Sequence, residues 1–373
     1  MAKYKLDDLC EFITDGTHQT PEYCEEGGVI FLSSKDVTER KINWDDVKHI
    51  PDSLHEKLYK RLRPQKNDIL LAKNGTTGVA AIVDRDEIFD IYVSLAVLRP
   101  IKSIYPKYLL YAINSPVAKR QFDAGLKGIG VPNLHLGVIR ETVINVAERE
   151  EQELICETLD KVAGIIDKRK AELNALDDLI KARFVEMFGD PISNPLGWKK
   201  RVLREVCTKL NDGTHFSPES FETGEYKYIT AKNIKMSGFD FSNITYVSEE
   251  VHRPIYERCN PEYGDVLYIK DGVTTGIAMV NTLEEEFTLL SSVALLKQDR
   301  RIMNGYFLTA FLNNESMYTD IRNNMGGAAI TRLTIAKLNA IKVILPPLDL
   351  QNQFADFVHQ VDKLKFIYPS YAA

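Results

Sequence analysis

The longest regular pattern of apolar positions lies in the middle of the chain, between residues 151 and 188. Apolar side chains recur there at alternating steps of four and three residues, at Ile155, Leu159, Val162, Ile166, Leu173, Leu176, Ile180 and Met187. The segment contains no proline, and Gly189-Asp190-Pro191 follows it. This heptad spacing predicts a helix of about 38 residues, about 57 Å long, whose apolar stripe requires a helical partner.

A shorter stretch with the same spacing closes the chain. Phe354, Val358 and Val361 repeat the seam, Ile367-Tyr368-Pro369 interrupts it, and the sequence ends at Ala373. We therefore expect the two helices to pair as an antiparallel coiled coil, with the second helix shortened to about half of the first.

Elsewhere the apolar residues form short runs bounded by Gly, Asn or Pro. Runs typical of buried strands occupy residues 68–72, 79–83, 92–98, 142–146 and 265–269. Residues 105–114 and 306–313 have the spacing of short helices. These patterns predict compact α+β domains, each with a curved, mostly antiparallel sheet.

The chain also contains two copies of one unit. Asp15-Gly16-Thr17-His18 returns 197 residues later as Asp212-Gly213-Thr214-His215, and Lys73-Asn74-Gly75 returns as Lys270-Asp271-Gly272. Further blocks repeat in the same order, pairing residues 31–37 with 228–234, 94–98 with 292–296, and 151–162 with 350–361. Two copies at so long a period indicate a pseudo-dimer within one chain, an arrangement suited to a ligand with two similar halves such as duplex DNA.

The repeat and the helices together predict four segments. Globular domains cover residues 1–147 and 190–347, a spacer helix covers 148–189, and the shortened C-terminal helix covers 348–373.

Composition narrows the functional classes. The 373 residues are 44% hydrophobic and 27% charged, as in a globular protein, and no apolar run is long enough to cross a bilayer. Five cysteines without a C-x-x-C pair argue against a disulfide scaffold or a zinc site, so we expect a cytoplasmic protein without a metal. With 47 basic and 53 acidic residues the net charge is −6, and binding to a polyanion would need a local basic patch.

Several motifs together resemble the specificity subunit of type I restriction–modification systems. They are the doubled Asp-Gly-Thr-His-x-[Thr/Ser]-Pro block, the doubled Thr-Thr-Gly block after a Lys-[Asn/Asp]-Gly turn, the Glu151-Gln152 opening of the long helix, and its end at residues 184–191. The likeness covers nearly the whole chain, and its specificity comes from the doubled order of the motifs.

This resemblance implies a non-catalytic DNA-recognition subunit. Two target-recognition domains would each recognise one half of a split double-stranded DNA sequence, and the paired helices would fix the gap between the halves. The same helices would dock modification subunits that methylate adenine, and restriction subunits would complete the complex. S-adenosylmethionine, ATP and Mg²⁺ are then expected on those partners, with no cofactor on this chain. The shortened second helix leaves self-association through the exposed seam as a further alternative.

Candidate DNA contacts come from matched turns and from Gly-rich loops. They are Lys35, Lys73, Asn74, Thr76, Lys127 and Asn133 in the first copy, and Lys232, Asn233, Lys270, Thr274, Asn324 and Arg332 in the second. Ordinary solvated lysines, tight hairpins and linker loops are the alternatives for these positions. Base-reading residues should differ between the copies, whereas matched residues should hold the scaffold or contact phosphate.

The doubled Asp/His pair could suggest catalysis, but the sequence offers no matching nucleophile or third ligand. We expect turn chemistry instead, with Asp as a cap and the following glycine at positive φ. A phosphate contact by His18 or His215 remains the minor alternative.

Functions of other classes fit less well. Pro346-Pro347 lacks the flanking residues of an adenine methyltransferase motif, and no phosphate-binding loop of a nucleotide-driven motor is present. A coiled-coil scaffold without sequence-specific DNA recognition accounts for residues 151–188 but leaves the two domains without a role.

Overall fold

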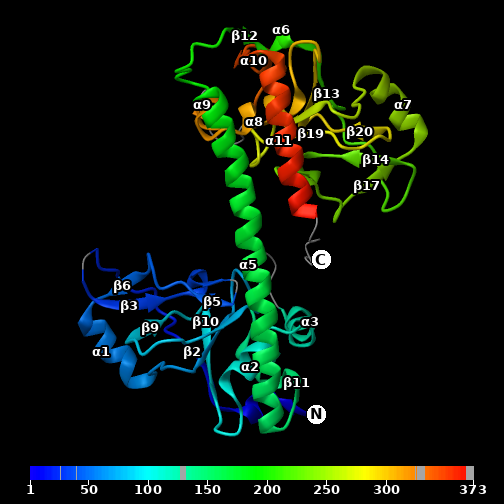
Figure 1. Cartoon of the computed structure of the whole chain (residues 1–373). Helices are drawn as coiled ribbons and strands as arrows, with labels where there is room; N and C mark the ends of the chain where they lie inside the picture. Colours follow the sequence, from blue (N-terminus) through cyan, green and yellow to red (C-terminus); the bar gives the residue numbers. More distant parts are fainter. Residues whose placement is uncertain (26, 39, 127–131, 324, 326–331, 367–373) are drawn as a thin grey trace. The chain divides into compact units, whose positions relative to one another are not determined.

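Figure 1 shows the computed structural model, which describes residues 1–366 apart from 26, 39, 127–131, 324 and 326–331. The chain forms two compact units, one covering Met1–Asp167 and the other beginning at Lys168. The division falls within a single helix, α5 (Arg149–Phe188).

The first unit is built on a four-stranded antiparallel sheet. Its strand order is β2 (Cys10–Asp15), β10 (Leu95–Pro100), β7 (Ile69–Ala72) and β8 (Ala80–Ile82). Both faces of this sheet are covered. Alternate residues of β7 enter different core clusters, Ile69 and Leu71 on one side and Leu70 on the other, which explains why the strand is apolar at every position.

Different elements cover the two faces of that sheet. The cluster on one face includes residues of α2 (Pro106–Ile113), α3 (Pro116–Gly125) and α4 (Leu136–Glu141). The cluster on the other includes β3 (Val29–Leu32) and β9 (Phe89–Ile91). Strand β3 pairs parallel with β9 and antiparallel with β6 (Lys48–Ile50).

Smaller elements complete the first unit. They are β1 (Ala2–Lys5) paired with β11 (Val143–Val146), β4 (Val37–Thr38) paired with β5 (Lys41–Ile42), α1 (Asp52–Arg61), and the 3-10 turns η1 (Leu6–Leu9) and η2 (Ser34–Asp36).

The second unit repeats this topology strand for strand. The four-stranded sheet has the order β13 (Cys207–Asp212), β21 (Val293–Gln298), β18 (Val266–Ile269) and β19 (Ala278–Val280). Strand β14 (Tyr226–Ile229) lies between β17 (Thr245–Val247) and its parallel partner β20 (Phe287–Leu289). The matching strand orders confirm that the chain contains an internal repeat.

Further elements of the second unit also have counterparts in the first. The strand pairs are β12 (Lys200–Val202) with β22 (Lys342–Ile344) and β15 (Ile234–Lys235) with β16 (Gly238–Phe239). The helices and turns are α6 (Leu203–Val206), α7 (Glu249–Arg258), α8 (Gly305–Asn313), α9 (Glu315–Asn323), α10 (Ile335–Asn339) and η3 (Ala231–Asn233).

The expected α+β class and the mostly antiparallel pairing are confirmed. The strands of each unit are distributed over several small sheets, however. Among the described residues, β3 pairs parallel with β9 in the first unit and β14 pairs parallel with β20 in the second. The periodicity of a buried strand is the same in either pairing direction, so the sequence pattern did not distinguish them. The short helices expected at 105–114 and 306–313 are present as α2 and α8.

The long helix and its partner are present in the second unit. Helix α11 (Leu348–Phe366) lies along the C-terminal part of α5 (Figure 1). Ring centroids of Phe354 and Phe184 are 5.6 Å apart, and Lys365 Nζ lies 2.7 Å from Asp177 Oδ1. Arg169 Nη2 donates to the carbonyl oxygen of Lys365 at 2.8 Å. Residues later in α11 contact residues earlier in α5, so the two helices run antiparallel, as expected.

The heptad seam of α5 is covered over only part of its length. Leu173, Leu176, Ile180 and Met187 are half-buried. Ile155 packs on the core of the first unit. Between these stretches, Leu159, Val162 and Ile166 are 38%, 48% and 41% exposed. In the described part of the chain, no helix is both long and apolar enough to cross a bilayer.

Candidate functional site

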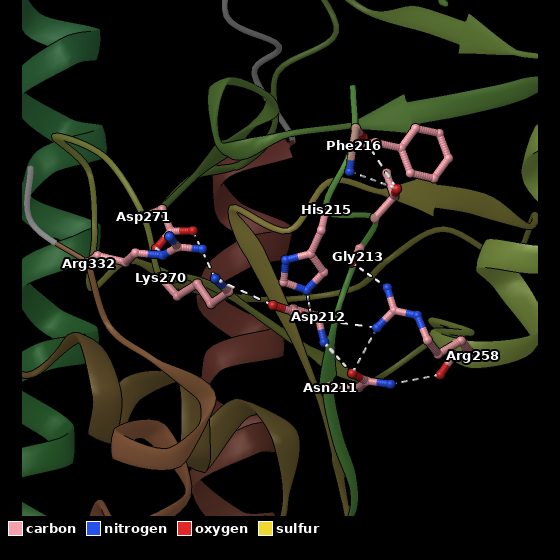
Figure 2. A network of polar contacts seen from close by, with 10 residues as sticks. Asn211, Asp212, Gly213, His215, Phe216, Arg258, Lys270, Asp271 and Arg332 are labelled. Carbon is pink, nitrogen blue, oxygen red and sulfur yellow. Dashed lines mark hydrogen bonds and ion pairs between the residues drawn. The ribbon is translucent and has the colours of Figure 1, made fainter. Parts of the chain in front are cut away.

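A network of polar contacts surrounds the Asp-Gly-Thr-His turn of the second unit (Figure 2). Asp212 is the last residue of β13, and Lys270 directly follows β18. Lys270 Nζ lies 3.4 Å from Asp212 Oδ2 and 2.8 Å from Asp271 Oδ2, and both Lys270 and Asp212 are buried. The lysine thus joins two turns that lie far apart in the sequence.

The first unit has the equivalent ion pair. Asp15 ends β2, Lys73 follows β7, and Lys73 Nζ lies 2.5 Å from Asp15 Oδ2. Burial alone would raise the pKa of the Asp15 carboxyl, but the hydrogen bonds and charges of Lys73 and His18 outweigh it and lower that pKa. Because removing two charges from water is costly, a pair kept in both units indicates that it fixes a particular conformation.

A histidine extends each ion pair toward the surface. Nε2 of His18 lies 3.3 Å from Asp15 Oδ1, and Nε2 of His215 lies 3.1 Å from Asp212 Oδ1. The side chains of the two histidines are 71% and 61% exposed. Each imidazole is therefore accessible from solvent but oriented by a buried carboxylate.

An arginine from a neighbouring helix completes each network. Arg61 of α1 donates from Nη2 to the carbonyl oxygen of Asp15 at 2.8 Å. Arg258 of α7 donates to the carbonyl oxygen of Gly213, and its Nη1 lies 3.6 Å from Asp212 Oδ1 (Figure 2). We name these matched sets the anchor networks; they comprise Asp15, His18, Arg61 and Lys73 in the first unit and Asp212, His215, Arg258 and Lys270 in the second.

The sequence analysis missed both arginines, although a signal was present. Leu58-Tyr59-Lys60-Arg61 and Ile255-Tyr256-Glu257-Arg258 match at the same offset of 197 residues as the Asp-Gly-Thr-His turns. The helices α1 and α7 that carry these arginines are mostly polar, so they contain no long apolar run that marks them in the sequence.

The glycine of each turn is required for a reason other than the expected positive φ. Neither Gly16 nor Gly213 has a positive φ. A Cβ on Gly16 would lie 2.0 Å from the carbonyl oxygen of Ile91, and one on Gly213 would lie 1.9 Å from that of Leu289. The close approach of a neighbouring strand therefore excludes any side chain, and the expectation of a left-handed glycine is wrong at these positions.

The expected Gly turns after Lys73 and Lys270 are confirmed as hairpins between β7 and β8 and between β18 and β19. Gly75 and Gly272 have φ values of 75° and 102°, which only glycine adopts readily.

Backbone bridges bring predicted contact residues together beside these turns. Asn74 lies opposite Asn133, and Asp271 lies opposite Arg332. The side chain of Arg332 also pairs with that of Asp271, with Nε 3.3 Å from Oδ1 (Figure 2). Thr76, Thr274 and Arg332 are exposed, and Asn74 and Asn133 are half-buried.

Lys35 and Lys232 are exposed on one-turn 3-10 helices that lie against the same hairpins. The connection runs through Ser94, whose Oγ accepts from the backbone N–H of Ser34 at 3.0 Å while its carbonyl oxygen accepts from Lys73 N at 2.8 Å. Ser292 makes the equivalent contacts with Ala231 and Lys270.

Three of the candidate contact residues are buried. Lys73 and Lys270 face the carboxylates of the anchor networks. Asn233 caps η3, with its Oδ1 accepting from Thr230 and its Nδ2 donating to the carbonyl oxygen of Asp240. These side chains point into the protein, where they form the ion pairs and the hydrogen bonds of the cap. Lys127 and Asn324 lie outside the described residues.

The matched anchor networks carry residues that differ between the copies. The residue after the histidine is Gln19 in one turn and Phe216 in the other, and the second Gly turn has one additional residue, Val273. Among the described residues, no group of His, Cys, Asp and Glu side chains is arranged to hold a metal ion.

Comparison with known proteins agrees with this duplication. A family model described as the type I restriction modification DNA specificity domain matches residues 1–176 and 195–367, nearly the whole chain. The chain belongs to this family. Each matched segment of the specificity-domain protein contains one complete anchor network.

Two type I specificity subunits show distant sequence similarity to this chain. The type I restriction enzyme MjaIX specificity subunit of Methanocaldococcus jannaschii is 21% identical over 319 residues, which are 79% of this chain and 70% of the relative. The EcoBI specificity subunit of Escherichia coli is 24% identical over 265 residues, 64% of this chain and 55% of the relative.

A solved structure supports the fold. The type I restriction-modification system S subunit from M. genitalium superposes with a TM-score of 0.52 at 17% identity. The superposition covers 98% of this chain and 90% of that one, so the fold is shared over essentially the full length of the specificity-domain protein.

Proposed function

We propose that this chain is the DNA-sequence specificity subunit of a type I restriction–modification complex and performs no bond chemistry itself. Residues 1–147 and 190–347 act as target-recognition domains, each for one half of a bipartite target. Residues 148–189 form the conserved spacer helix, and the helix that begins at Leu348 is its antiparallel partner. The complex works in the cytoplasm, and S-adenosylmethionine, ATP and Mg²⁺ bind to partner subunits.

The single observation that carries this proposal is the pair of anchor networks. Buried residues of identical type hold the same turns in both units, while exposed residues on those turns differ, as in Gln19 against Phe216. A protein that contacts the DNA backbone in the same way in both half-sites, but recognises a different base sequence in each, needs matched supporting residues together with variable exposed residues. Phosphate contacts set the register, and variable side chains contact base edges.

The candidate contacts divide into two roles under this proposal. Exposed and half-buried residues touch DNA directly, namely Lys35, Asn74, Thr76, Asn133, Lys232, Thr274 and Arg332, together with Lys127 and Asn324. Lys73, Lys270 and Asn233 act by holding the contact loops in position. The exposed lysines supply phosphate contacts, which make binding salt-dependent.

The uncovered stretch of α5 is the proposed docking surface for the modification subunits. Leu159, Val162 and Ile166 present an apolar stripe at heptad spacing, which fits a helix of a partner. Self-association through this stripe is the second possibility for the same surface. Restriction subunits join the assembled complex.

Co-purification with the modification subunit, followed by mapping of methylated adenines on genomic DNA, tests the proposal. A split motif with a fixed gap supports it. A chain exchange that replaces residues 190–347 by another such domain should alter one half of the motif only. Methylation without any sequence preference would leave the coiled-coil scaffold as the better account.

A further inference from the structure

Each Gly hairpin, β7–β8 or β18–β19, is bonded to a short helix by the side-chain amide of one asparagine. Asn114, which caps the C-terminal end of α2, accepts from the backbone N–H of Ala80 and donates to the carbonyl oxygen of the same residue, both at 3.0 Å. Asn313, the last residue of α8, makes the same two bonds with Ala278, both at 2.8 Å. Each amide thus holds the first residue of β8 or β19 through one donor and one acceptor.

The position of these strands explains why such a contact is needed. Strands β8 and β19 lie at the ends of the two four-stranded sheets. An edge strand presents backbone N–H and C=O groups that have no partner strand. Ala80 and Ala278 are fully buried, so backbone groups left there without partners would cost free energy. The asparagine amide supplies the partners that a neighbouring strand would supply, close to the turn of each hairpin.

The helices that carry the asparagines are held at their other ends by a glutamine. Gln152 of α5 accepts at 2.8 Å from the backbone N–H of Tyr105, the N-cap of α2. Gln351 of α11 accepts at 2.9 Å from the backbone N–H of Asn304, the N-cap of α8. Both glutamines are buried, and each also donates from Nε2 to backbone carbonyl oxygens. Each short helix therefore connects a Gly hairpin to α5 or α11, with a bonded amide at either end.

These amide contacts are the same in the two units, whereas the hairpins that they hold are not. The two asparagines are 199 residues apart, and so are the two glutamines. On the hairpins, Asn74 of the first unit is replaced by Asp271 in the second, and Val273 has no counterpart. Val273 is also 91% exposed. The same support thus carries a different set of exposed residues in each unit, as expected if the support places those residues on two different half-sites.

We propose that Asn114 and Asn313 are positioning residues for DNA recognition, each fixing where the exposed residues of one Gly hairpin lie on its half-site. This inference rests on the proposed function and extends it to residues that touch no DNA. Hydrogen bonds to base edges weaken steeply when their distance or angle changes. A hairpin that is no longer held to its helix therefore loses discrimination between base pairs.

The test measures the affinity of the complex with its modification subunit for the target duplex and for duplexes in which one base pair is changed. One changed base pair ordinarily lowers affinity about tenfold. Asn114→Leu has a side chain of similar size but makes neither bond, and it should reduce this factor to about twofold at the positions of one half-site that the hairpin contacts. The other half-site should keep its full discrimination. Asn313→Leu should have the reverse effect.

Gln121 of α3 provides a matched control, because its amide makes the same two bonds to a strand that carries no candidate contact residue. Its Nε2 donates to the carbonyl oxygen of Val143 at 2.8 Å, and its Oε1 accepts from the backbone N–H of Val143 at 2.9 Å. Gln121→Leu should lower the thermal midpoint, as Asn114→Leu does, but retain full discrimination at both half-sites.

Asn114→Asp is a second variant that keeps the bond from the N–H of Ala80 and loses only the bond to its carbonyl oxygen. It should discriminate to a degree between the wild type and Asn114→Leu, and it carries the test if Asn114→Leu does not assemble. Discrimination is a ratio of two affinities for the same protein, so the added charge of the aspartate affects both affinities and cancels.

The outcomes separate this inference from the proposed function. If the wild-type complex discriminates and the asparagine variants discriminate equally well despite a lower thermal midpoint, the amides are merely structural and the inference is overturned alone. A loss of discrimination in Gln121→Leu as large as that in Asn114→Leu also overturns it, because any loosening of the unit would then have the same effect. A wild-type complex that binds DNA without sequence preference contradicts the proposed function, and with it the inference that rests on it.

Discussion

The ammonium group of Lys270 lies 3.4 Å from Asp212 Oδ2, and the two residues are only 2% and 3% exposed. Lys73 and Asp15 repeat this buried pair in the first unit. A charge pair inside a protein contributes little net stability, but removing one partner leaves an unpaired buried charge. The pairs therefore serve to hold the Asp-Gly-Thr-His turn against the Gly hairpin.

Lys270→Met should destabilise the second unit by about 1–3 kcal/mol, because the buried Asp212 carboxylate would keep only its contacts with His215 and Arg258. Urea denaturation followed by fluorescence measures the effect. Lys232→Met, at an exposed lysine of the same unit, should shift the midpoint little. Equal shifts in the two variants would contradict the positioning role of Lys270.

Part of this arrangement was predictable from the sequence. The doubled blocks located the turns, and the heptad spacing identified α5 and its antiparallel partner. The burial of Lys73 was not predictable, since a lysine before a Gly turn resembles any solvated lysine until its carboxylate partner is known. That partner, Asp15, is distant in sequence, and only the strand pairing of β2, β10 and β7 brings it close.

The reason for a glycine at position 16 was likewise not predictable from the local sequence. A glycine in a turn suggests positive φ, but here the carbonyl oxygen of Ile91 occupies the space of a side chain. Such a close approach depends on how the second sheet lies against the first, which no local pattern encodes. The arginines of α1 and α7 could have been predicted, because the tetrapeptides that contain them repeat at the same offset as the other matching blocks.

Val273 should contribute to base recognition in the second half-site. It is 91% exposed on a turn that Arg322 holds through Nη1 contacts of 3.3 Å to Val273 O and 3.1 Å to Thr275 O. The first unit has no equivalent residue. An apolar side chain presented in this way suits the methyl group of thymine.

Replacing thymine by deoxyuridine at the contacted position should weaken binding about fourfold, corresponding to about 0.8 kcal/mol for one methyl group. Val273→Ala should remove most of this difference, as seen in a competition assay that scans every thymine of the second half-site. Ile88→Ala, at an exposed apolar residue of the first unit, provides the control. If no thymine of that half-site responds to Val273→Ala, the assignment is wrong.

Acidification should destabilise the second unit through His252. This imidazole is fully buried, with Nδ1 2.9 Å from Thr288 Oγ1 and Nε2 3.2 Å from Glu286 Oε2. Burial lowers its pKa below the usual 6.5, against the opposing effect of Glu286. Below about pH 6.5 the unfolded chain therefore binds a proton that the folded chain does not, and stability falls with pH until the lowered pKa is passed.

Urea midpoints between pH 7.5 and 5.5 measure this effect. His252→Gln should have a lower midpoint at pH 7.5 but a weaker dependence on pH across the window. Burial also raises the pKa of the Asp265 carboxyl, so the comparison with His252→Gln is needed to assign the effect to the histidine. A pH dependence that is the same with and without His252 would assign the effect to other groups.

The exposed seam of α5 should be needed for assembly but not for folding. Val162→Lys and Ile166→Lys replace exposed apolar side chains, so the thermal midpoint of the isolated chain should change little. Both substitutions place a charge where a partner helix would be buried, and they should weaken co-purification with the modification subunit or self-association by tenfold or more, about 1.4 kcal/mol. Glu157→Lys, at an exposed position outside the seam, is the matched control.

Shortening α5 should change the gap between the half-sites. Deleting residues 161–167 removes one heptad while retaining Asp160, which bonds to Lys107 and Tyr111 in the first unit, and Arg169, which bonds to Lys365 in the second. The deletion shortens the helix by about 10.5 Å. At 3.4 Å per base pair, this length corresponds to about three base pairs. The deletion also removes Val162 and Ile166 of the proposed docking surface, so the mapping uses the fraction of the complex that still co-purifies with the modification subunit. Methylation mapping of this fraction should find the same two half-sites at a smaller separation, because no residue of either anchor network is altered. An unchanged gap in a folded, active complex would exclude α5 as the element that sets the spacing, and altered half-sites would show that the helix also influences the recognition loops.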